Sequence, residues 1–326
     1  MTAIVSARTT PALRGGVGTA PRPDDRAACH HGRMHPVTGA FAAATAAGVA
    51  ALSYSLWEAQ SFRLRRVSVA ILPAGSRPLR LLHISDIHLT SGQRKKREWV
   101  HDLARLEPDL VVVTGDFISN APAVPAVTAA LSPLLRRPGA FVFGSNDYFD
   151  AKLKNPLKYL HRPSSVGRRK PNLPTADLGR RLTSHGWLDL NNRQGELRVA
   201  DISLSMVGVD DPHIQRDRIE TIKGGFDRGA AARIGVTHSP YLRVLDAFAA
   251  EGADLILAGH THGGQICLPG YGALVTNCDL DRTRVKGLSE YRGHPLHVSA
   301  GVGTNPYTPI RLACPPEATL LTLTGR

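Results

Sequence analysis

The chain has 326 residues, of which 42% are apolar and 21% are charged, and its formal net charge is +13. This composition excludes a wholly disordered chain and leaves room for one large globular domain with an appendage. The positive charge favours anionic partners such as phosphates, nucleic acid or acidic lipid. The four cysteines lack the paired C-x-x-C spacing of a zinc knuckle and give no sign of a disulfide framework.

The first 36 residues are rich in Arg, Pro, Gly, Ala and His and show no apolar period. Such a composition predicts a disordered basic tail over residues 1–36. Met34 directly precedes the next segment, and one hypothesis is that it is the true start of the protein.

Residues 37–58 are predicted to form a membrane-spanning anchor. The segment carries no charge before Glu58, and Tyr54 and Trp57 near its end suit a membrane interface. The alternatives are a buried Ala-rich helix and a cleaved signal peptide; the absence of Lys or Arg between Met34 and the apolar run argues against the latter. Three basic residues follow the segment: Arg63, Arg65 and Arg66. By the positive-inside rule they place the following domain on the cytoplasmic side.

From residue 59 onward the pattern becomes that of an α/β domain. A helix is expected over residues 97–107, before the proline that precedes the next apolar run. Apolar, β-branched runs that each contain a predicted strand cover residues 79–85, 109–116, 140–147, 203–213, 232–240, 255–264, 294–303 and 318–323.

Each of the first six runs leads into Asp, Asn or His. Loops at the ends of buried strands are where α/β proteins place their chemistry. In the run LILAGHTHGG, His260 and His262 are two residues apart and can face one pocket in extended chain. Taken singly, Asp86 or Asp116 could cap a helix and His238 could be a turn residue. Together, carboxylate, imidazole and amide ligands suit Mn²⁺, Fe²⁺ or Zn²⁺ rather than Ca²⁺ or structural zinc.

The order of these motifs resembles the calcineurin-like metallophosphoesterase superfamily over residues 79–326. D-x-H begins at Asp86, and G-D, G-S-N-D, a lone His and G-H-T-H follow in that order. The stretches 263–278 and 303–323 look like the membrane-associated bacterial branch of YkuE- and YaeI-type phosphoesterases. The resemblance implies a metallophosphoesterase domain over residues 59–326, built as a four-layer α/β/β/α sandwich with two divalent metal ions at one end of the paired sheets.

The resemblance also implies which residues would hold the metals. The first metal would be bound by Asp86, His88 and His262, the second by Asn146, His238 and His260, and both by a bridging Asp116. A bridging carboxylate is physically reasonable, because two dications about 3.5–4 Å apart repel each other unless an anion lies between them. The same arrangement acidifies a bridging water and generates the hydroxide that attacks phosphorus.

The third motif departs from the family pattern of Gly-Asn-His-Asp/Glu, since this chain has Gly144, Ser145, Asn146 and Asp147. Aligned without a gap, Ser145 would replace the metal ligand. We favour a slip of one residue that keeps Asn146 as the ligand, because a neutral hydroxyl binds metals poorly. The histidine that assists the leaving group is missing, and Asp147 or His213 is the candidate catalytic residue in its place. For His213, a role as a turn residue is the alternative.

Two basic segments follow the first and third motifs. One is RKKR at 94–97, and the other is an insertion at 151–181 with nine Lys or Arg against one acid. We expect both to leave the sheet at the metal end, where their charge would attract an anionic substrate or an acidic membrane surface. The candidate substrate-binding residues are Arg94, Lys95, Lys96, Arg97, Arg168 and Arg169. The alternative is a pair of solvated loops kept soluble by their charge.

The sequence therefore predicts a hydrolase at the membrane that acts on a phosphomonoester, a phosphodiester or a pyrophosphate of a small molecule or a lipid. Two alternatives stay open: a nuclease of the same fold, and a metal-binding protein with little turnover. A polynucleotide substrate is less favoured, because the basic segments lack the interleaved aromatics that base stacking requires. The identity of the metals, the natural substrate and the oligomeric state are not predicted.

Overall fold

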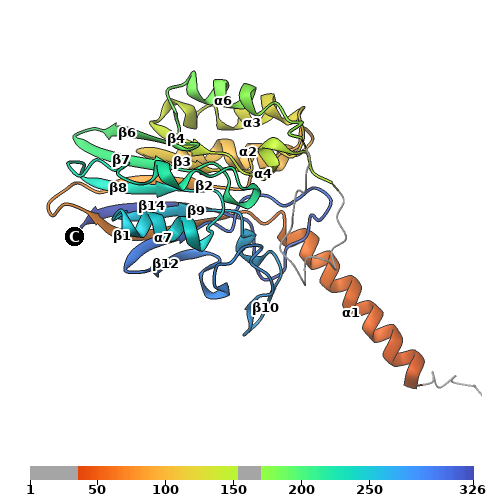
Figure 1. Ribbon diagram of the computed structural model, residues 1–326. Coiled ribbons are helices and arrows are strands. Elements are labelled where there is room, and N and C mark those ends of the chain that lie inside the picture. The colour runs from red at the N-terminus through yellow and green to blue at the C-terminus, as the bar shows by residue number, and fades with distance from the viewer. Residues whose placement is uncertain (1–35, 153–169) are drawn as a thin grey trace, which may run out of the picture. The chain divides into compact units, whose positions relative to one another are not determined.

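A computed structural model describes residues 36–152 and 170–326 of the chain (Figure 1). The first of its two six-stranded sheets has the order β1-β14-β2-β3-β4-β5. Its strands are β1 (Arg63–Leu72), β14 (Glu317–Gly325), β2 (Leu79–Ile84), β3 (Leu110–Thr114), β4 (Gly139–Val142) and β5 (Leu188–Asp189). Strands β2 to β5 run parallel to one another, whereas β14 is antiparallel to β2.

The second sheet has the order β12-β13-β9-β8-β7-β6. Its strands are β12 (Gly287–Tyr291), β13 (His294–Val298), β9 (Leu255–Ala258), β8 (Ala232–Val236), β7 (Ile202–Gly208) and β6 (Arg193–Val199). The four inner strands are parallel, and the edge strands β12 and β6 are antiparallel to their neighbours. Parallel strands bring their carboxyl ends to the same edge of a sheet, so each sheet offers one edge from which several loops emerge.

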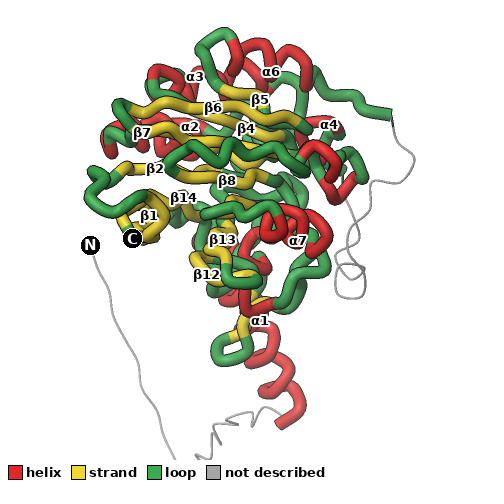
Figure 2. Tube along the Cα trace, turned by 60° about the vertical axis from the view of Figure 1, so that its left-hand side comes forward, coloured by secondary structure: helices red, strands yellow, loops and turns green. Residues whose placement is uncertain are grey.

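Helices cover the outer face of each sheet (Figures 1 and 2). The first sheet is covered by α2 (Arg94–Asp102), α3 (Ala123–Leu131) and α6 (Thr175–Thr183), and the second by α7 (Leu242–Ala250). The short elements are α4 (Ser145–Tyr148), β10 (Cys267–Leu268), β11 (Gly272–Ala273), η1 (Leu103–Leu106), η2 (Leu134–Arg136), η3 (Pro212–Ile214), η4 (Ile219–Thr221), η5 (His262–Gly264) and η6 (Arg282–Arg284). The predicted four-layer α/β/β/α sandwich is confirmed.

The side-chain period of two divides each inner strand between two cores. In β3, Leu110 and Val112 pack between the sheets, whereas Val111 and Val113 face the helices. A strand buried on both faces reads as an unbroken apolar run, which is how β3 and β9 look in the sequence. The core between the sheets therefore fixes how the two strand edges face each other.

All eight predicted runs contain a strand, with β2, β3, β4, β7, β8, β9, β13 and β14 beginning within one residue of the expected position. The helix expected at 97–107 begins earlier, at Arg94, and gives way to the 3-10 helix η1 after Asp102. Residues 175–181 of the predicted basic insertion belong to α6, whose Leu178 packs into the outer core. The insertion's residues 153–169 lie outside the described part of the chain.

Helix α1 (Pro36–Glu58) has 23 residues. Within the described residues it is the one helix that is long and apolar enough to cross a membrane by length and composition, over Ala40–Glu58. Internal contacts divide the chain into two units, Met1–Ala46 and Ala47–Arg326, so their boundary falls inside this helix. The predicted disordered tail lies, apart from Pro36, outside the described residues.

Candidate metal centre

Every predicted metal ligand lies within a few residues of the end of a buried strand. Asp86 and His88 follow β2, Asp116 follows β3, Asn146 follows β4, His238 follows β8, and His260 and His262 follow β9. Five of them have left-handed backbone: Asp86, His88, Asp116, His260 and His262, with φ between 45° and 69°. Such a backbone costs a non-glycine residue about 1–3 kcal/mol and persists only where the surroundings fix it. The tight turns aim side chains from both sheets at one place.

The first predicted ligand set is assembled in the structure. The Nε2 atoms of His88 and His262 lie 3.2 Å apart, and their rings stack. Asp86 Oδ1 lies 3.9 Å from His88 Nε2 and 3.5 Å from His262 Nε2. These three residues offer ligand atoms within 4.8 Å of one another, as a single metal ion requires.

The second set gathers around Asp116 and His238. Asp116 Oδ2 lies 3.5 Å from His238 Nε2, and His238 Nε2 lies 3.3 Å from His260 Nδ1. A group of potential ligands within 4.8 Å is formed by Asp116, His238 and again Asp86. Asp86 thus lies within reach of both groups, although the resemblance assigns it to the first metal alone.

Asp116 occupies the place between the two sets. Its Oδ2 lies 3.3 Å from His88 Nε2 in the first set and 3.5 Å from His238 Nε2 in the second. A carboxylate at this position can bind two cations at once, as the bridging role implied by the resemblance requires.

Backbone carbonyls orient the imidazoles. Thr114 O lies 2.6 Å from His238 Nδ1, Asn277 O lies 3.2 Å from His260 Nε2, and Gly303 O lies 3.1 Å from His262 Nδ1. A carbonyl oxygen only accepts hydrogen bonds, so each of these three contacts favours a proton on the nitrogen that faces it. With the proton there, the other nitrogen of each ring can bind a metal, which is the usual arrangement of metal-binding histidines.

Burial governs the ionisation of the first set. It raises the pKa of Asp86 to about 6, with Asp116 adding to the rise and His238 opposing it. It lowers the pKa of His88 to about 4 and holds the pKa of His262 well below its usual value. The imidazoles of this set are therefore neutral near pH 7, as metal ligation requires.

Charge pairing governs the second set. Burial acts to raise the pKa of Asp116, but His238 and His88 together hold it well below its usual value. Burial acts to lower the pKa of His238, but Asp116 raises it well above its usual value. Asp116 is an anion that attracts positive charge to this spot, and a metal cation can take the place of the His238 proton.

The residues present fit a pair of divalent cations. Asp86 Oδ1 is buried and has no hydrogen-bond partner among the described residues, although it points at two imidazole nitrogens. The absence of a side chain at Gly144 and Gly259 leaves space for Asp116 and Ser85: a Cβ on Gly144 would lie 2.3 Å from Asp116 Oδ1, and one on Gly259 would lie 1.8 Å from Ser85 Oγ. The mixture of carboxylate and imidazole donors suits Mn²⁺, Fe²⁺ or Zn²⁺.

Asp147, predicted to be catalytic, has a different place. It is fully buried, and its two oxygens accept hydrogen bonds from the backbone N–H groups of Asp116 (2.8 Å), Phe117 (2.8 Å), Ile118 (3.3 Å) and Gly144 (3.0 Å). Burial and Asp116 raise its pKa, and these donors oppose the rise. A carboxyl group engaged on every side cannot also reach a leaving group, so we correct its role to holding the loop that carries Asp116.

Asn146 contacts the predicted bridging carboxylate. Its backbone N–H donates to Asp116 Oδ1 and its Nδ2 to Asp116 Oδ2, both at 2.7 Å. Nδ2 also lies 3.4 Å from Ser145 Oγ. The amide binds a metal through its oxygen, so the ligand role that we predict for Asn146 requires the amide to turn over.

His213 lies beside the second set. Its ring centroid is 4.5 Å from that of His260, and its Nδ1 is 3.1 Å from the hydroxyl of Tyr241. The backbone N–H of His213 donates to Asp211, which holds the short helix η3 in place.

The first basic segment forms the start of α2 rather than a free loop. Lys96, predicted to bind substrate, is buried, and its Nζ donates to the carbonyl of Ile87 at 2.9 Å. Burial lowers the pKa of Lys96 to about 7. This prediction is therefore corrected: Lys96 holds the loop that carries Asp86 and His88.

Of the other predicted substrate-binding residues, the structure describes Arg94, Lys95 and Arg97, and within the described part of the chain none of these three bonds to a predicted metal ligand. Arg94 pairs with Glu98 on the surface, Lys95 Nζ donates to Gln60 O, and Arg97 is half-buried. Arg168 and Arg169 lie outside the described residues.

Sequence reasoning missed Arg311 and Asn277. Arg311 is fully buried, and its Nη2 lies 3.3 Å from His262 Nδ1. Asn277 O accepts from His260, as described above. Both lie in the stretches 263–278 and 303–323, which carry the resemblance to the bacterial branch, so their place in the sequence was the available signal.

A four-layer sandwich with carboxylates and imidazoles at its strand ends defines a metal-dependent hydrolase. The chain belongs to the calcineurin-like phosphoesterase family, whose model matches residues 79–264. Its activity is therefore the hydrolysis of phosphoester bonds, and the YkuE- and YaeI-type branch is confirmed by the relatives that it resembles.

Three relatives illustrate the range of similarity. The uncharacterized metallophosphoesterase YkoQ of Bacillus subtilis is 29% identical over 254 residues, covering 76% of this chain and 84% of that protein. Phosphodiesterase YaeI of Escherichia coli is 26% identical over 287 residues, covering 86% of this chain and 94% of that protein. A transmembrane protein with metallophosphoesterase domain from Bos taurus is 28% identical over 212 residues, covering 61% of this chain and 44% of that protein.

We predict that Asp147→Asn lowers the free energy of unfolding by about 1–3 kcal/mol, because the amide presents N–H to buried N–H donors that need an acceptor. Hydrolysis of activated and unactivated esters should fall by the same factor. Denaturant unfolding and an assay on a p-nitrophenyl and an alkyl ester measure both effects. Asp177→Asn on the surface of α6 is the control and should change little. A loss confined to the alkyl ester would restore Asp147 as the proton donor.

Proposed function

We propose that this protein is a membrane-anchored phosphodiesterase that works with two divalent metal ions. The observation that carries the proposal is the position of Asp116 Oδ2, 3.3 Å from His88 Nε2 and 3.5 Å from His238 Nε2. One carboxylate between two imidazole sets is what a pair of cations needs in order to sit close together.

The ligand assignment follows the two sets. Asp86, His88 and His262 would hold one ion, Asn146, His238 and His260 the other, and Asp116 both. When bound, such a pair supplies a nucleophile at neutral pH by acidifying water and polarises the phosphate oxygens. The chain's own contribution is to fix these ligands: carbonyls set the imidazole orientation, and Asp147 fixes the loop of Asp116.

A phosphodiester is the substrate class that we favour among the three predicted ones. The relative YaeI, similar along 86% of this chain, is named a phosphodiesterase. A net charge of +13 favours the approach of an anion, and a membrane anchor favours a lipid-linked one. A phosphomonoesterase, a pyrophosphatase and a nuclease are the other outcomes of the substrate test.

His213 is the residue that we assign to protonation of the leaving group. It lies against His260 and so borders the second metal position. Its Nδ1 lies 3.1 Å from the hydroxyl of Tyr241, and we assign Nε2 to the leaving oxygen. This assignment replaces the family's missing histidine with one from a different loop.

Helix α1 is the proposed membrane anchor. Its apolar stretch Ala40–Glu58 has the length and hydropathy of a span. The similarity to a bovine protein named for its transmembrane character supports the same reading. Arg63, Arg65 and Arg66 follow the helix, and by the positive-inside rule they favour a cytoplasmic catalytic domain.

We predict that Asp116→Ala abolishes metal loading and hydrolysis together. Removing the carboxylate between the cations should lower the hydrolysis of bis(p-nitrophenyl) phosphate with Mn²⁺ by at least about 10³-fold, since each such electrostatic contribution is worth several kcal/mol. Metal analysis of the purified protein and the assay measure the two effects. Asp201→Ala on the surface is the control. Two Mn²⁺ ions still bound per chain in Asp116→Ala would contradict the bridging assignment, and an inactive, metal-loaded parent would identify a binding protein.

A second prediction separates His213 from the metal ligands. His213→Ala should slow hydrolysis of an alkyl or phenyl diester by about 10²–10⁴-fold, because the departing alkoxide needs a proton. Hydrolysis of the p-nitrophenyl diester should fall much less, since p-nitrophenolate leaves unprotonated. Parallel kinetics on the two substrates with equal metal content provide the measurement. An equal loss on both would show that His213 only supports the loop.

Removing residues 1–46 should release the protein from the membrane. The twelve residues of α1 that remain, Ala47–Glu58, are too short to span a bilayer, which takes about 20 residues. Sedimentation of membranes after a high-salt wash tests this, since salt screens attraction of basic residues to acidic lipid. The full-length chain is the control and should stay in the pellet. A truncated chain that also stays there would rule out α1 as the principal anchor.

A further inference from the structure

The last turn of helix α1 is unlike the rest of the helix. Leu52 and Trp57 are more than half exposed, whereas the polar residues Ser55 and Glu58 are 7% and 5% exposed. A buried carboxylate at the end of an apolar helix is costly unless it is paired or hydrogen-bonded. Its partners therefore show what this turn does.

Both partners lie in one segment near the C-terminus. Glu58 Oε2 accepts a hydrogen bond from the backbone N–H of Cys314 at 3.3 Å, and the carbonyl of Ser55 accepts one from the N–H of Arg311 at 3.0 Å. Tyr54 on the same helix donates to Glu58 Oε1 at 3.2 Å and holds the carboxylate in this orientation. The helix end thus fixes the backbone of residues 311–314.

Arg311 extends this contact to the metal centre. Its Nη2 donates to the carbonyls of Ala300 (2.7 Å), Gly301 (3.1 Å) and Gly303 (2.7 Å), and its Nη1 donates to the carbonyl of His262 at 3.3 Å. Gly303 O is also the acceptor that faces His262 Nδ1. The buried guanidinium therefore fixes two groups: the backbone carbonyl of His262, and the carbonyl of Gly303 that faces the His262 ring.

Further bonds join the same two segments. Cys314 Sγ donates to the carbonyl of His262 at 3.3 Å, and Gln265 Nε2 donates to the carbonyls of Thr308 and Ile310, both at 3.1 Å. Segment 308–314 and the loop 262–265 are therefore one hydrogen-bonded body. The end of α1 joins this body from 256 residues away in the chain, through the bond between Glu58 and Cys314.

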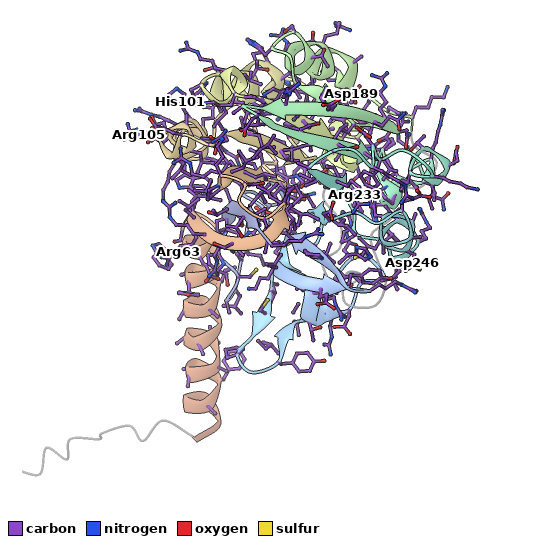
Figure 3. All side chains as sticks on the ribbon, turned by 90° about the vertical axis from the view of Figure 1, so that its left-hand side faces the viewer. Arg63, His101, Arg105, Asp189, Arg233 and Asp246 are labelled. Atoms are coloured by element: carbon purple, nitrogen blue, oxygen red, sulfur yellow. The ribbon has the colours of Figure 1, made fainter. Side chains whose placement is uncertain are left out.

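We infer that the last turn of the apolar helix positions the metal ligand His262, with Glu58 and Arg311 as positioning residues. Glu58 fixes residues 311–314, Arg311 fixes the carbonyls around His262, and His262 then presents Nε2 to the first metal. The inference rests on the proposed function, since it takes His262 as a ligand. The helix is then part of the catalytic domain from Ala47 onward, and Arg63, labelled in Figure 3, begins the first strand just beyond it.

Full-length protein in detergent, stripped of metal and titrated with Mn²⁺ alone, tests this. Glu58→Ala should lower the affinity for one of the two Mn²⁺ ions by about tenfold or more, as the loss of a residue that supports a metal ligand does. The affinity for the other ion should stay unchanged. Glu58→Gln keeps an acceptor oxygen for the Cys314 N–H and should bind both ions nearly as the parent does. Trp57→Ala, on the exposed side of the same turn, is the matched control for a general effect on the helix.

Four results would overturn the inference. The first is unchanged Mn²⁺ binding in Glu58→Ala. The second is an equal loss in Glu58→Gln, and the third an equal loss in Trp57→Ala. The fourth is an equal fall in the affinities for both ions, which would indicate a general loss of stability. Thermal unfolding of the metal-free variants measures that loss directly. A parent that binds no Mn²⁺ would overturn the proposed two-metal function. The four results above would instead overturn the positioning role and leave the two-metal function standing.

Discussion

The candidate metal centre and the loops around it depend on two buried carboxylates that face a cluster of imidazoles. Asp86 and Asp116 are 0% and 2% exposed, and each lies within 4 Å of imidazole nitrogens. Burial, with a smaller contribution from the charge of Asp116, raises the pKa of Asp86, whereas His238 and His88 keep Asp116 charged. Under the proposed function, divalent cations would supply the positive charge that both carboxylates need. The loops must then hold the ligands in place against their mutual repulsion.

The loops are held by buried ionisable side chains that bond to backbone. Asp147 accepts from the N–H groups of residues 116–118, Lys96 donates to the carbonyl of Ile87, and Arg311 donates to carbonyls around His262. Each of the three is buried, and each serves a different ligand loop. A left-handed turn at the end of a strand removes backbone groups from the sheet ladder and leaves them in need of partners. A side chain with several hydrogen-bonding atoms meets that need, and the same bonds fix the turn that aims the ligand.

The sequence allowed the strands and the ligand types to be predicted, because both depend on local pattern. A strand buried on both faces needs an apolar run such as LVVV. Metal ligation needs residue types such as Asp, Asn and His, and here these follow successive strands in the order of the family motifs. The roles of Asp147, Lys96 and Arg311 were not predictable in this way. Their partners lie 31, 9 and 49 residues away or come from a different strand, and only the folded chain places them together. Charge therefore assigned Lys96 to the substrate, and the missing histidine of the third motif assigned Asp147 to proton transfer.

The boundary between the apolar helix and the catalytic domain also depends on contacts that local sequence pattern does not reveal. Hydropathy places it after residue 58, where charged residues begin, whereas the contacts of the chain place it between Ala46 and Ala47. The difference arises because hydropathy measures transfer to lipid, and Glu58 is satisfied by the Cys314 N–H rather than by water. A residue in this turn is thus subject to two requirements, one from the membrane interface and one from the metal loop. Under the proposed anchoring, the same helix that fixes the protein at the bilayer also carries the support of a metal ligand, so the place of the reaction and the order of its site depend on one turn of chain.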